Sequence, residues 1–385
     1  MTWAGTNNGS YPLAASALLE LADLRLSAKQ IQRAVNEVGQ ARVAERDASV
    51  EQLRVKTFAE RRAGSLAGEP PDLAVIMTDG GRYQRRDNFA GEPTRQAGEK
   101  HWRESKVGCL LSMTSDVHES DPCPQFPEWL AESEAVRELA SVSGKSAAQT
   151  GALADDLAAA NPATYPPPEL LARDVLASGE DVHSFGWQLE SRAWQLGFPA
   201  AQRQAFVGDG AATNWTIQQR HFPQAVPILD LMHALSYACA AAAAVDAGDC
   251  YPRWAEWIWQ GKVRLVIDQL AEHRERLGTP PADAQPSDPR LDVDRAWTYY
   301  TNNQGRMNYP EYRRQGLPLT SSHIESTVKQ INQRIKGSEK FWRRDSGEAV
   351  LQLRADSLSD SQPLTPFWRR WQSQQTGSNH YRAAA

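Results

Sequence analysis

Cysteine is scarce in this chain, and the few that occur are not spaced for metal binding. No two of the four cysteines form a CxxC pair, so the spacing predicts no zinc module. Reduced thiols in a cytoplasmic protein are the expectation. The four are Cys109, Cys123, Cys239 and Cys250.

Long apolar runs are also absent. The run Ala240–Ala244 is too short to cross a bilayer. The apolar N-terminal stretch has no basic segment before it and is broken by Glu20 and Asp23. The sequence therefore predicts neither a transmembrane segment nor a signal peptide, and no membrane partner.

A positive net charge is missing too, although one region is basic. The formal net charge is −5, but residues 303–372 hold twelve Lys or Arg and seven Asp or Glu, so this stretch is +5 and the rest −10. A basic region joined to an acidic body can still bind the DNA backbone. Aromatic residues among these cations suit base stacking and helix packing equally. They are Tyr309, Tyr312, Phe341, Trp342, Phe367, Trp368 and Trp371.

Residues 1–65 are predicted to be mainly helical. The small, polar residues 1–10 are expected to be disordered, and a helix is expected over Leu13–Leu24. Ser27–Gln30 has the pattern of a capping box that opens a second helix. The two helices fit a helix-turn-helix that binds DNA, and they fit an ordinary helical hairpin as well. A charged third helix is expected over Ala41–Arg62.

From residue 70 onward, apolar runs alternate with helical patterns. The excursion over 116–168 is rich in Pro, Asp and Ala and is expected to be a loop with short helices. A helix is expected over Leu170–Leu196, with Trp187 and Trp194 in the core, and residues 234–300 are expected to be all helix. The predicted strands are Leu73–Gly81, Tyr83–Arg86 and Lys106–Met113, as an antiparallel meander, followed by Ala205–Val207 and Val226–Leu229.

Two of these strands run into an acid followed by glycine, at Asp79 and Asp209. Each pattern alone is a common turn. A third acid, Glu325, lies on a helix that begins near Thr320 and ends at Gly337. Its neighbours on the polar face are cations and an amide, and a lone Glu in such a place is usually a solvated, weakly paired side chain.

The three acids together predict more than each does alone. Carboxylates gathered at one edge of a sheet would repel one another unless hard cations lay between them. Mg²⁺ prefers such oxygen ligands. Two ions can activate a nucleophilic water or 3′-OH and stabilise the leaving oxygen in phosphoryl transfer.

The order and surroundings of these acids resemble a known family. The order is Asp79, Asp209, Glu325, and the segment His221–His233 has a Phe-Pro-x-Ala strand followed by Asp230 and His233. The last motif includes Ile324-Glu325-Ser326, Arg334, Lys336-Gly337 and Trp342. Over about residues 70–345 the chain resembles bacterial insertion-sequence transposases of the DDE class, related to the Mutator superfamily. Ser322-His323 departs from the small residue or glycine pair expected there.

The resemblance implies an α/β fold: a ribonuclease H-like mixed sheet with flanking helices, interrupted by an all-helical insertion, plus a helical N-terminal region. The implied parts are a helical region over 1–65, the core over 70–235, the insertion over 236–318, and a final segment over 319–385 with the catalytic Glu and a basic C-terminal region.

The resemblance also implies roles for particular residues. Asp79, Asp209 and Glu325 would be the catalytic residues and the ligands of two Mg²⁺ ions, with Mn²⁺ able to substitute. Asp230 and His233 would support the active site, and as neighbours at a helix start they suggest capping, with His233 as a ligand or proton shuttle the alternative. The residues expected to contact DNA are Lys329, Asn332, Arg334, Lys336 and Trp342.

The expected function is Mg²⁺-dependent DNA cleavage and strand transfer of an insertion sequence. The partners would be transposon ends and target DNA, bound by a homodimer or larger assembly in the bacterial cytoplasm, at the nucleoid. Two alternatives stay open: a metal-dependent nuclease without strand transfer, and a truncated or domesticated remnant that binds DNA without catalysis.

Overall fold

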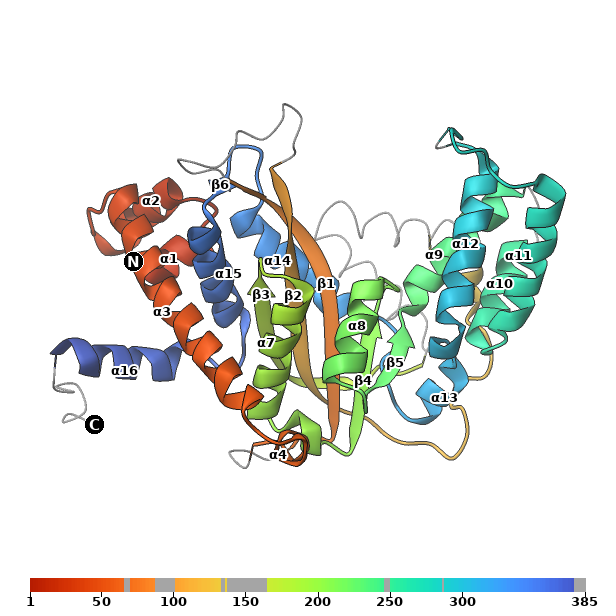
Figure 1. The fold of residues 1–385 in the computed structure, drawn as a ribbon, viewed down its shortest axis with the longest axis horizontal. Coiled ribbons are helices and arrows are strands. Elements are labelled where there is room, and N and C mark those ends of the chain that lie inside the picture. Colours follow the sequence, from red (N-terminus) through yellow and green to blue (C-terminus); the bar gives the residue numbers. More distant parts are fainter. Residues whose placement is uncertain are drawn as a thin grey trace.

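A six-stranded mixed sheet lies at the centre of the computed structural model, with helices on both faces (Figure 1). The strand order is β3-β2-β1-β4-β5, and β6 pairs with the far end of β1. The structure describes residues 1–65, 70–86, 101–132, 136, 165–245, 250–285 and 287–376. The strands are β1 (Leu73–Arg85), β2 (Trp102–Thr114), β3 (Glu169–Ser178), β4 (Arg203–Gly208), β5 (Val226–Leu229) and β6 (Phe341–Trp342).

Helices precede, connect and follow these strands. Short 3₁₀ turns lie at η1 (Glu128–Ala131), η2 (Phe198–Ala200) and η3 (Gln304–Arg306). The α-helices are α1 (Thr2–Asn7), α2 (Tyr11–Ala22), α3 (Ala28–Arg54), α4 (Phe58–Ala63), α7 (Val182–Gln195), α8 (Ala212–His221), α9 (Leu231–Ala244), α10 (Cys250–Trp259), α11 (Val263–Leu277), α12 (Pro289–Asn303), α13 (Tyr309–Arg314), α14 (Ser322–Ile335), α15 (Arg344–Leu358) and α16 (Leu364–Thr376).

The pairing changes direction at β1. β1, β2 and β3 are antiparallel, whereas β1, β4 and β5 are parallel, so the predicted mixed α/β sheet is confirmed. The segment Tyr83–Arg86 is not a separate strand as predicted, because β1 continues to Arg85. β4 pairs with β1 only as far as Met77, while β2 pairs on to Gln84. Asp79 therefore lies just past the point where β1 loses its parallel neighbour.

Helices α7 and α14 cover opposite faces of the sheet. A Cβ on Gly108 of β2 would meet Leu189 of α7, while the next residue, Cys109, contacts Thr327 of α14. Successive residues of a strand point to opposite faces. The apolar run at the start of β1 is therefore buried on both sides.

The N-terminal helices pack on the C-terminal part of the chain. Ser27 forms the predicted capping box with Gln30 and starts α3. Disorder over residues 1–10 is a wrong prediction, because α1 forms there and packs against α3 and α15. The separate third helix over Ala41–Arg62 is also wrong, because α3 runs unbroken to Arg54 along α15.

Strand β3 occupies the first part of the helix predicted over Leu170–Leu196. This segment pairs antiparallel with β2, and α7 begins only after its cap, Asp181. Edge pairing overrides the local helix preference of its Leu and Ala residues. Trp187 and Trp194, predicted to lie in the core, are only partly buried, and cationic side chains lie over their rings.

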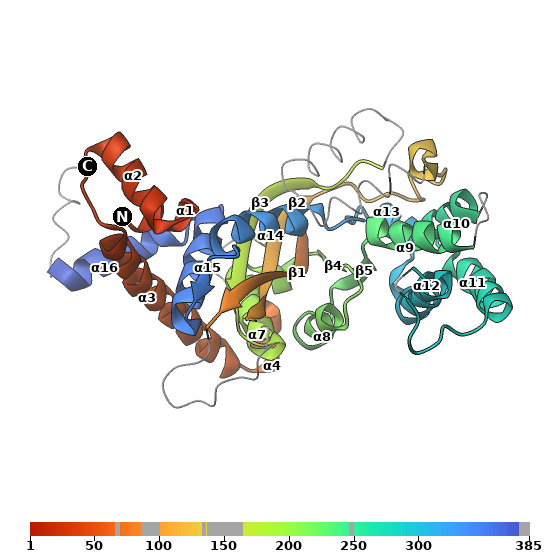
Figure 2. The ribbon, with the colours of Figure 1, turned by 90° about the horizontal axis from the view of Figure 1, so that it is seen from above.

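Helices α9 to α13 follow β5 and extend away from that edge of the sheet, while α1 to α3 lie at the opposite end (Figures 1 and 2). Trp254 and Trp259 are buried within this helical extension. The chain then returns to the sheet as α14, which packs on β1 and β2. Much of the predicted excursion over 116–168 lies outside the described residues. No helix in the described part of the chain is long and apolar enough to cross a membrane.

Gly39 lies where α3 meets α15, and its size is predicted to matter. A Cβ here would lie 2.6 Å from the Cβ of Ala349 and 2.7 Å from its carbonyl oxygen. We expect Gly39→Ala to lower the free energy of unfolding by about 1–3 kcal/mol through overpacking, although alanine alone favours a helix by about 1 kcal/mol. Thermal unfolding measures the change.

The control for this variant is Gly305→Ala, because an added Cβ there has no neighbour within 4 Å. A Gly39→Ala protein at least as stable as wild type would contradict the close packing of the two helices.

Candidate active site

Asp79 lies on β1 at the edge left open by the end of β4. A carboxylate oxygen of Asp79 accepts a hydrogen bond from the Gly80 N–H at 2.6 Å. A cavity of about 160 Å³ opens here, and both Asp79 and Asp209 line it. Glu104 and Lys106 of β2, which pair at 3.0 Å, line the same cavity. Two of the predicted acids thus share one pocket.

Asp209 follows β4 and is held by the first turn of α8. Its Oδ1 accepts hydrogen bonds from the Ala211 N–H at 3.0 Å and from Nδ2 of Asn214 at 2.9 Å. The other end of the Asn214 amide accepts a hydrogen bond from the Thr78 hydroxyl at 2.9 Å. This buried amide fixes Asp209 to β1, next to Asp79.

The turn after Asp209 is closed by the helical extension. The Tyr299 hydroxyl of α12 donates a hydrogen bond to the Asp209 carbonyl at 2.9 Å, and its ring stacks on Tyr237 of α9 at 3.9 Å between centroids. Gly210 has φ +98°, and a Cβ there would lie 2.6 Å from the Tyr299 ring. Glycine is required at this position both by the backbone conformation and by the close approach of the ring.

Asp230 is buried at the junction of β5, α9 and α14. Its Oδ1 caps α9 by accepting a hydrogen bond from the His233 N–H at 2.8 Å. Its Oδ2 accepts hydrogen bonds from the N–H of Ser321 at 2.5 Å and from its hydroxyl at 2.7 Å. One carboxylate therefore holds the starts of two helices, which agrees with its predicted capping role.

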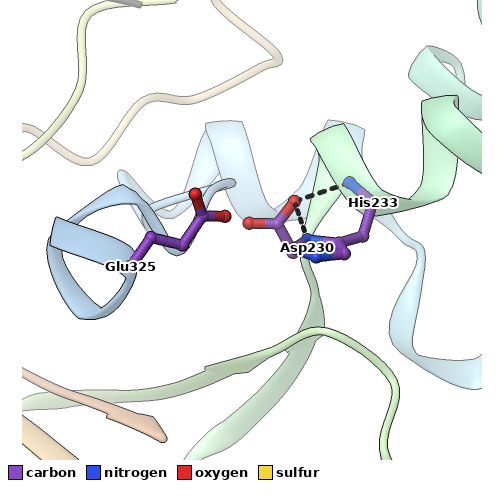
Figure 3. Close-up of side chains that lie close together, drawn as sticks. All are labelled: Asp230, His233 and Glu325. Carbon is purple, nitrogen blue, oxygen red and sulfur yellow. Dashed lines mark hydrogen bonds and ion pairs between the residues drawn. The ribbon is translucent and has the colours of Figure 1, made fainter. Parts of the chain in front are cut away.

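Glu325 lies on the first turn of α14 and points toward Asp230 (Figure 3). One potential ligand atom from each of Asp230, His233 and Glu325 lies within 4.8 Å of the others. The His233 Nδ1 is 3.3 Å from Oδ1 of Asp230. Because both oxygens of Asp230 already accept hydrogen bonds, we assign it a supporting role.

The pKa values of Asp79, Glu325 and His233 are raised, and the charges of neighbouring carboxylates contribute to each shift. Burial, with the charge of Asp209, raises the pKa of Asp79 to about 6. Burial, with the charges of Asp230 and Asp79, raises the pKa of Glu325 to about 7. Burial opposes protonation of His233, but the ion-pair contact of its ring with Asp230 and the charges of Glu325 and Asp209 outweigh this and raise its pKa to about 9.

Comparison with known proteins adds no assignment. No protein-family model matches the chain, and no curated protein matches it either. The functional argument therefore depends on the geometry of the site itself. The catalytic and metal-binding roles of Asp79, Asp209 and Glu325 stay predictions.

Two of the predicted DNA contacts are largely buried in the structure. Arg334 is 3% exposed; it donates a hydrogen bond to the Gly5 carbonyl at 2.9 Å and lies over the rings of Tyr11 and Trp342. Trp342 is 7% exposed, and its Nε1 donates to the Ile335 carbonyl at 2.9 Å. The prediction that Arg334 contacts DNA is wrong, because its guanidinium is buried under the N-terminal helices. Trp342 as a DNA contact stays a prediction, because it also lines a cavity beside α3.

The other three predicted contacts have different surroundings. Lys336 is exposed at the end of α14, and Lys329 is partly exposed one turn after Glu325. Asn332 packs against the backbone of Gly81 on β1, since a Cβ on that glycine would lie 2.8 Å from its Oδ1. Lys329, Asn332 and Lys336 as DNA contacts therefore stay predictions, and Asn332 also packs α14 onto the sheet.

Sequence reasoning missed Asn214 and Tyr299. It identified Ser321 as a possible helix start but missed its contact with Asp230. Asn214 carries a weak local signal, because it is a polar residue in the first turn of the helix after Asp209. Tyr299 lies 90 residues from Asp209, and Ser321 lies 91 residues from Asp230. No local pattern connects residues so far apart.

The two basic residues at the end of α14 are predicted to differ in their effect on stability when each is replaced by alanine. Arg334→Ala should lower the free energy of unfolding by roughly 2–4 kcal/mol, because it removes a buried hydrogen bond and two cation–π contacts. Lys336→Ala should change stability by less than about 0.5 kcal/mol, and should lower the salt dependence of DNA binding by about one unit if this lysine contacts a phosphate. Thermal unfolding and salt titrations of DNA binding measure the two effects. A stable Arg334→Ala variant would refute the structural role.

Stability of the metal-free protein is predicted to fall as the pH rises. A group whose pKa is raised in the folded state favours folding below its ordinary pKa, and that contribution is lost as the pH rises through the folded value. Asp79, Glu325 and His233, with folded pKa values of about 6, 7 and 9, all act in this direction. In EDTA, we expect the melting temperature to decline between pH 5 and pH 9.

Glu325→Gln is the matched comparison, because it removes one of these titrations. Between pH 5 and pH 9, the free energy of unfolding of this variant should fall by roughly 1–2 kcal/mol less than that of the wild type, after allowance for solvent screening. At pH 8, Mg²⁺ should stabilise the wild type more than this variant. Identical pH profiles for the two proteins would show that Glu325 has an ordinary pKa.

Proposed function

We propose that this protein is a DDE transposase, which cleaves DNA and joins the freed end to a target with Mg²⁺. The observation that supports the proposal is the cavity that Asp79 of β1 and Asp209, after β4, line together. Glu325 of α14 is near enough for the charge of Asp79 to raise its pKa, although the possible ligand atoms grouped with it among the described residues belong to Asp230 and His233. The order of the three acids along the chain is Asp, Asp, Glu, as the resemblance requires.

The sheet supports a ribonuclease H-like core. Its order is β3-β2-β1-β4-β5, with three antiparallel strands first in the chain and two parallel strands after them. Asp79 lies on the central strand, and Asp209 follows the strand beside it. The helical extension between β5 and α14 corresponds to the expected insertion.

The donor set suits hard divalent cations. All three predicted ligands are carboxylates, which Mg²⁺ prefers and Mn²⁺ accepts. The raised pKa values of Asp79 and Glu325 add support, because crowded, buried carboxylates without a cation retain protons. Asp79, Asp209 and Glu325 would hold two Mg²⁺ ions, which activate a hydroxyl nucleophile and stabilise the leaving oxygen.

The surrounding residues would set position and charge. Asp230 holds the start of α14 and therefore the backbone of Glu325. His233, with a pKa of about 9, is a cation at neutral pH and reduces repulsion among the carboxylates. Lys329 lies one turn after Glu325, where it could neutralise a phosphate near the cut.

In the proposed reaction, water first attacks the phosphodiester and releases a 3′-OH. This hydroxyl then attacks a phosphodiester of the target, and the target's own 3′ oxygen leaves. No covalent bond between enzyme and DNA is needed. Joining two transposon ends requires two sites, so a homodimer or larger assembly on DNA belongs to the proposal, acting at the bacterial nucleoid.

The decisive variant is Glu325→Gln. Glutamine retains the shape and helix preference of the side chain and removes only the charge that binds metal. We expect cleavage and strand transfer to fall by several orders of magnitude while DNA binding holds. The assay uses labelled DNA carrying the element's ends, a target plasmid and Mg²⁺, and it resolves nicked from joined products.

Glu272→Gln, on the exposed face of α11, controls for loss of one negative charge. Cutting without joined products would assign the protein as a nuclease. Binding without cutting by the wild type would make it a remnant that binds DNA. A Glu325→Gln protein that cuts and joins at the wild-type rate would refute the proposed site.

A further inference from the structure

A basic pocket lies where three distant segments of the chain meet. It has a volume of about 450 Å³ and lies between α3, the end of β1, and the connection from β6 to α15. Four cationic side chains line it: Lys29, Arg33, Arg86 and Arg343. We propose that this basic pocket binds the phosphate backbone of the DNA substrate, an inference that rests on the proposed function.

The charge of the basic pocket is of one sign. No carboxylate is found among the described residues that line it, and its other lining residues are amides, aromatics and a serine. The neighbouring cavity of about 610 Å³, between α3, α7 and α15, has acidic and basic side chains together. There, Arg46 pairs with Glu348 at 2.7 Å. The neighbouring cavity therefore holds charges of both signs, whereas the described residues that line the basic pocket carry positive charge alone.

The start of α15 adds a second, independent preference for an anion. Arg343 is the N-cap residue, and no side chain caps the helix. Ser346, in the first turn, lines the basic pocket. The first N–H groups of a helix carry partial positive charge and bind phosphate. The first turn also contains the acidic Asp345, which lines the neighbouring cavity and is not among the residues that line the basic pocket. Backbone dipole and side-chain charge therefore act together on the side of the basic pocket.

The position of the basic pocket suits a long substrate. β1 carries Asp79, and Arg86 follows directly after its end, where β6 pairs with it. At about 3.3 Å per residue, the strand places the pocket roughly 20 Å from Asp79. DNA rises about 3.4 Å per base pair, so this span corresponds to about six base pairs. A free phosphate compound could not use both sites at once, and an extended polyanion could.

Phe341 orients one of the cations. The Arg86 guanidinium lies 4.9 Å from the centre of the Phe341 ring, and His101 meets the same ring edge-on at 5.5 Å. Arg86 is otherwise exposed. The ring therefore lies against the guanidinium itself, and both side chains line the basic pocket.

The test is the salt dependence of binding to labelled duplex DNA, measured by fluorescence anisotropy in EDTA. The variant is Lys29→Gln with Arg33→Gln, two exposed residues one turn apart on α3. We expect the slope of log K against log salt to fall by about two units, and affinity at 0.1 M salt to fall roughly 10- to 100-fold for any sequence. Melting temperatures should match the wild type.

The matched control is Arg264→Gln with Arg276→Gln, two exposed cations on α11 outside the basic pocket. It changes the net charge equally and should leave the slope unchanged. An equal loss in control and variant would overturn the proposal, because net charge alone would then explain binding. An unchanged slope in the Lys29 and Arg33 variant would overturn it as well.

Two further comparisons test which ligand the basic pocket binds and whether this inference fails separately from the proposed function. Inorganic phosphate and a mononucleotide are titrated against bound DNA; if either occupies the basic pocket while the substitutions leave DNA binding unaffected, the proposal is wrong. Because binding is measured in EDTA, it is independent of catalysis. DNA binding through the pocket without cleavage would refute the proposed function alone, and cleavage with an unchanged slope would refute this inference alone.

Discussion

A single buried carboxylate joins the two parts of the candidate active site. Asp230 caps α9 with one oxygen and binds the N–H and hydroxyl of Ser321 with the other. The helical extension lies between these residues in the chain, yet they meet at one point. Glu325 is in the first turn of α14, which Ser321 begins, so its distance from β1 depends on this contact. An unpaired buried donor costs about 1–3 kcal/mol, and a carboxylate satisfies all three donors here.

Elements whose signals are local could be predicted from the sequence, and elements decided by distant partners could not. The capping box at Ser27 and the apolar runs of β1 and β4 involve only neighbouring residues, and these predictions are confirmed. β3 has a sequence that favours a helix, and only its pairing with β2 makes it a strand. α1 is ordered for the same reason, because it packs on α3 and α15.

The residues of the candidate site also fall into those with a local sequence signal and those whose surroundings depend on distant parts of the chain. A strand followed by an acid and glycine pointed to Asp79 and Asp209, and the structure places both beside one pocket. Arg334 looked like its neighbour Lys336 in the sequence, because both are basic and close in the chain. Burial separates them, and burial depends on Gly5 and Tyr11, which lie more than three hundred residues earlier. Spacing finds charged residues but not which of them the fold covers.

The contact between Arg334 and α1 limits how this protein can be re-engineered. The guanidinium lies on the helix that carries Glu325, and its hydrogen-bond acceptor is a carbonyl of α1. Removing the first two helices would leave a buried charge without that acceptor and without the Tyr11 ring, on the helix that carries Glu325. Any exchange of the N-terminal helices would therefore have to retain α1 and the start of α2. A new targeting module is better appended in front of Met1 than substituted for this region.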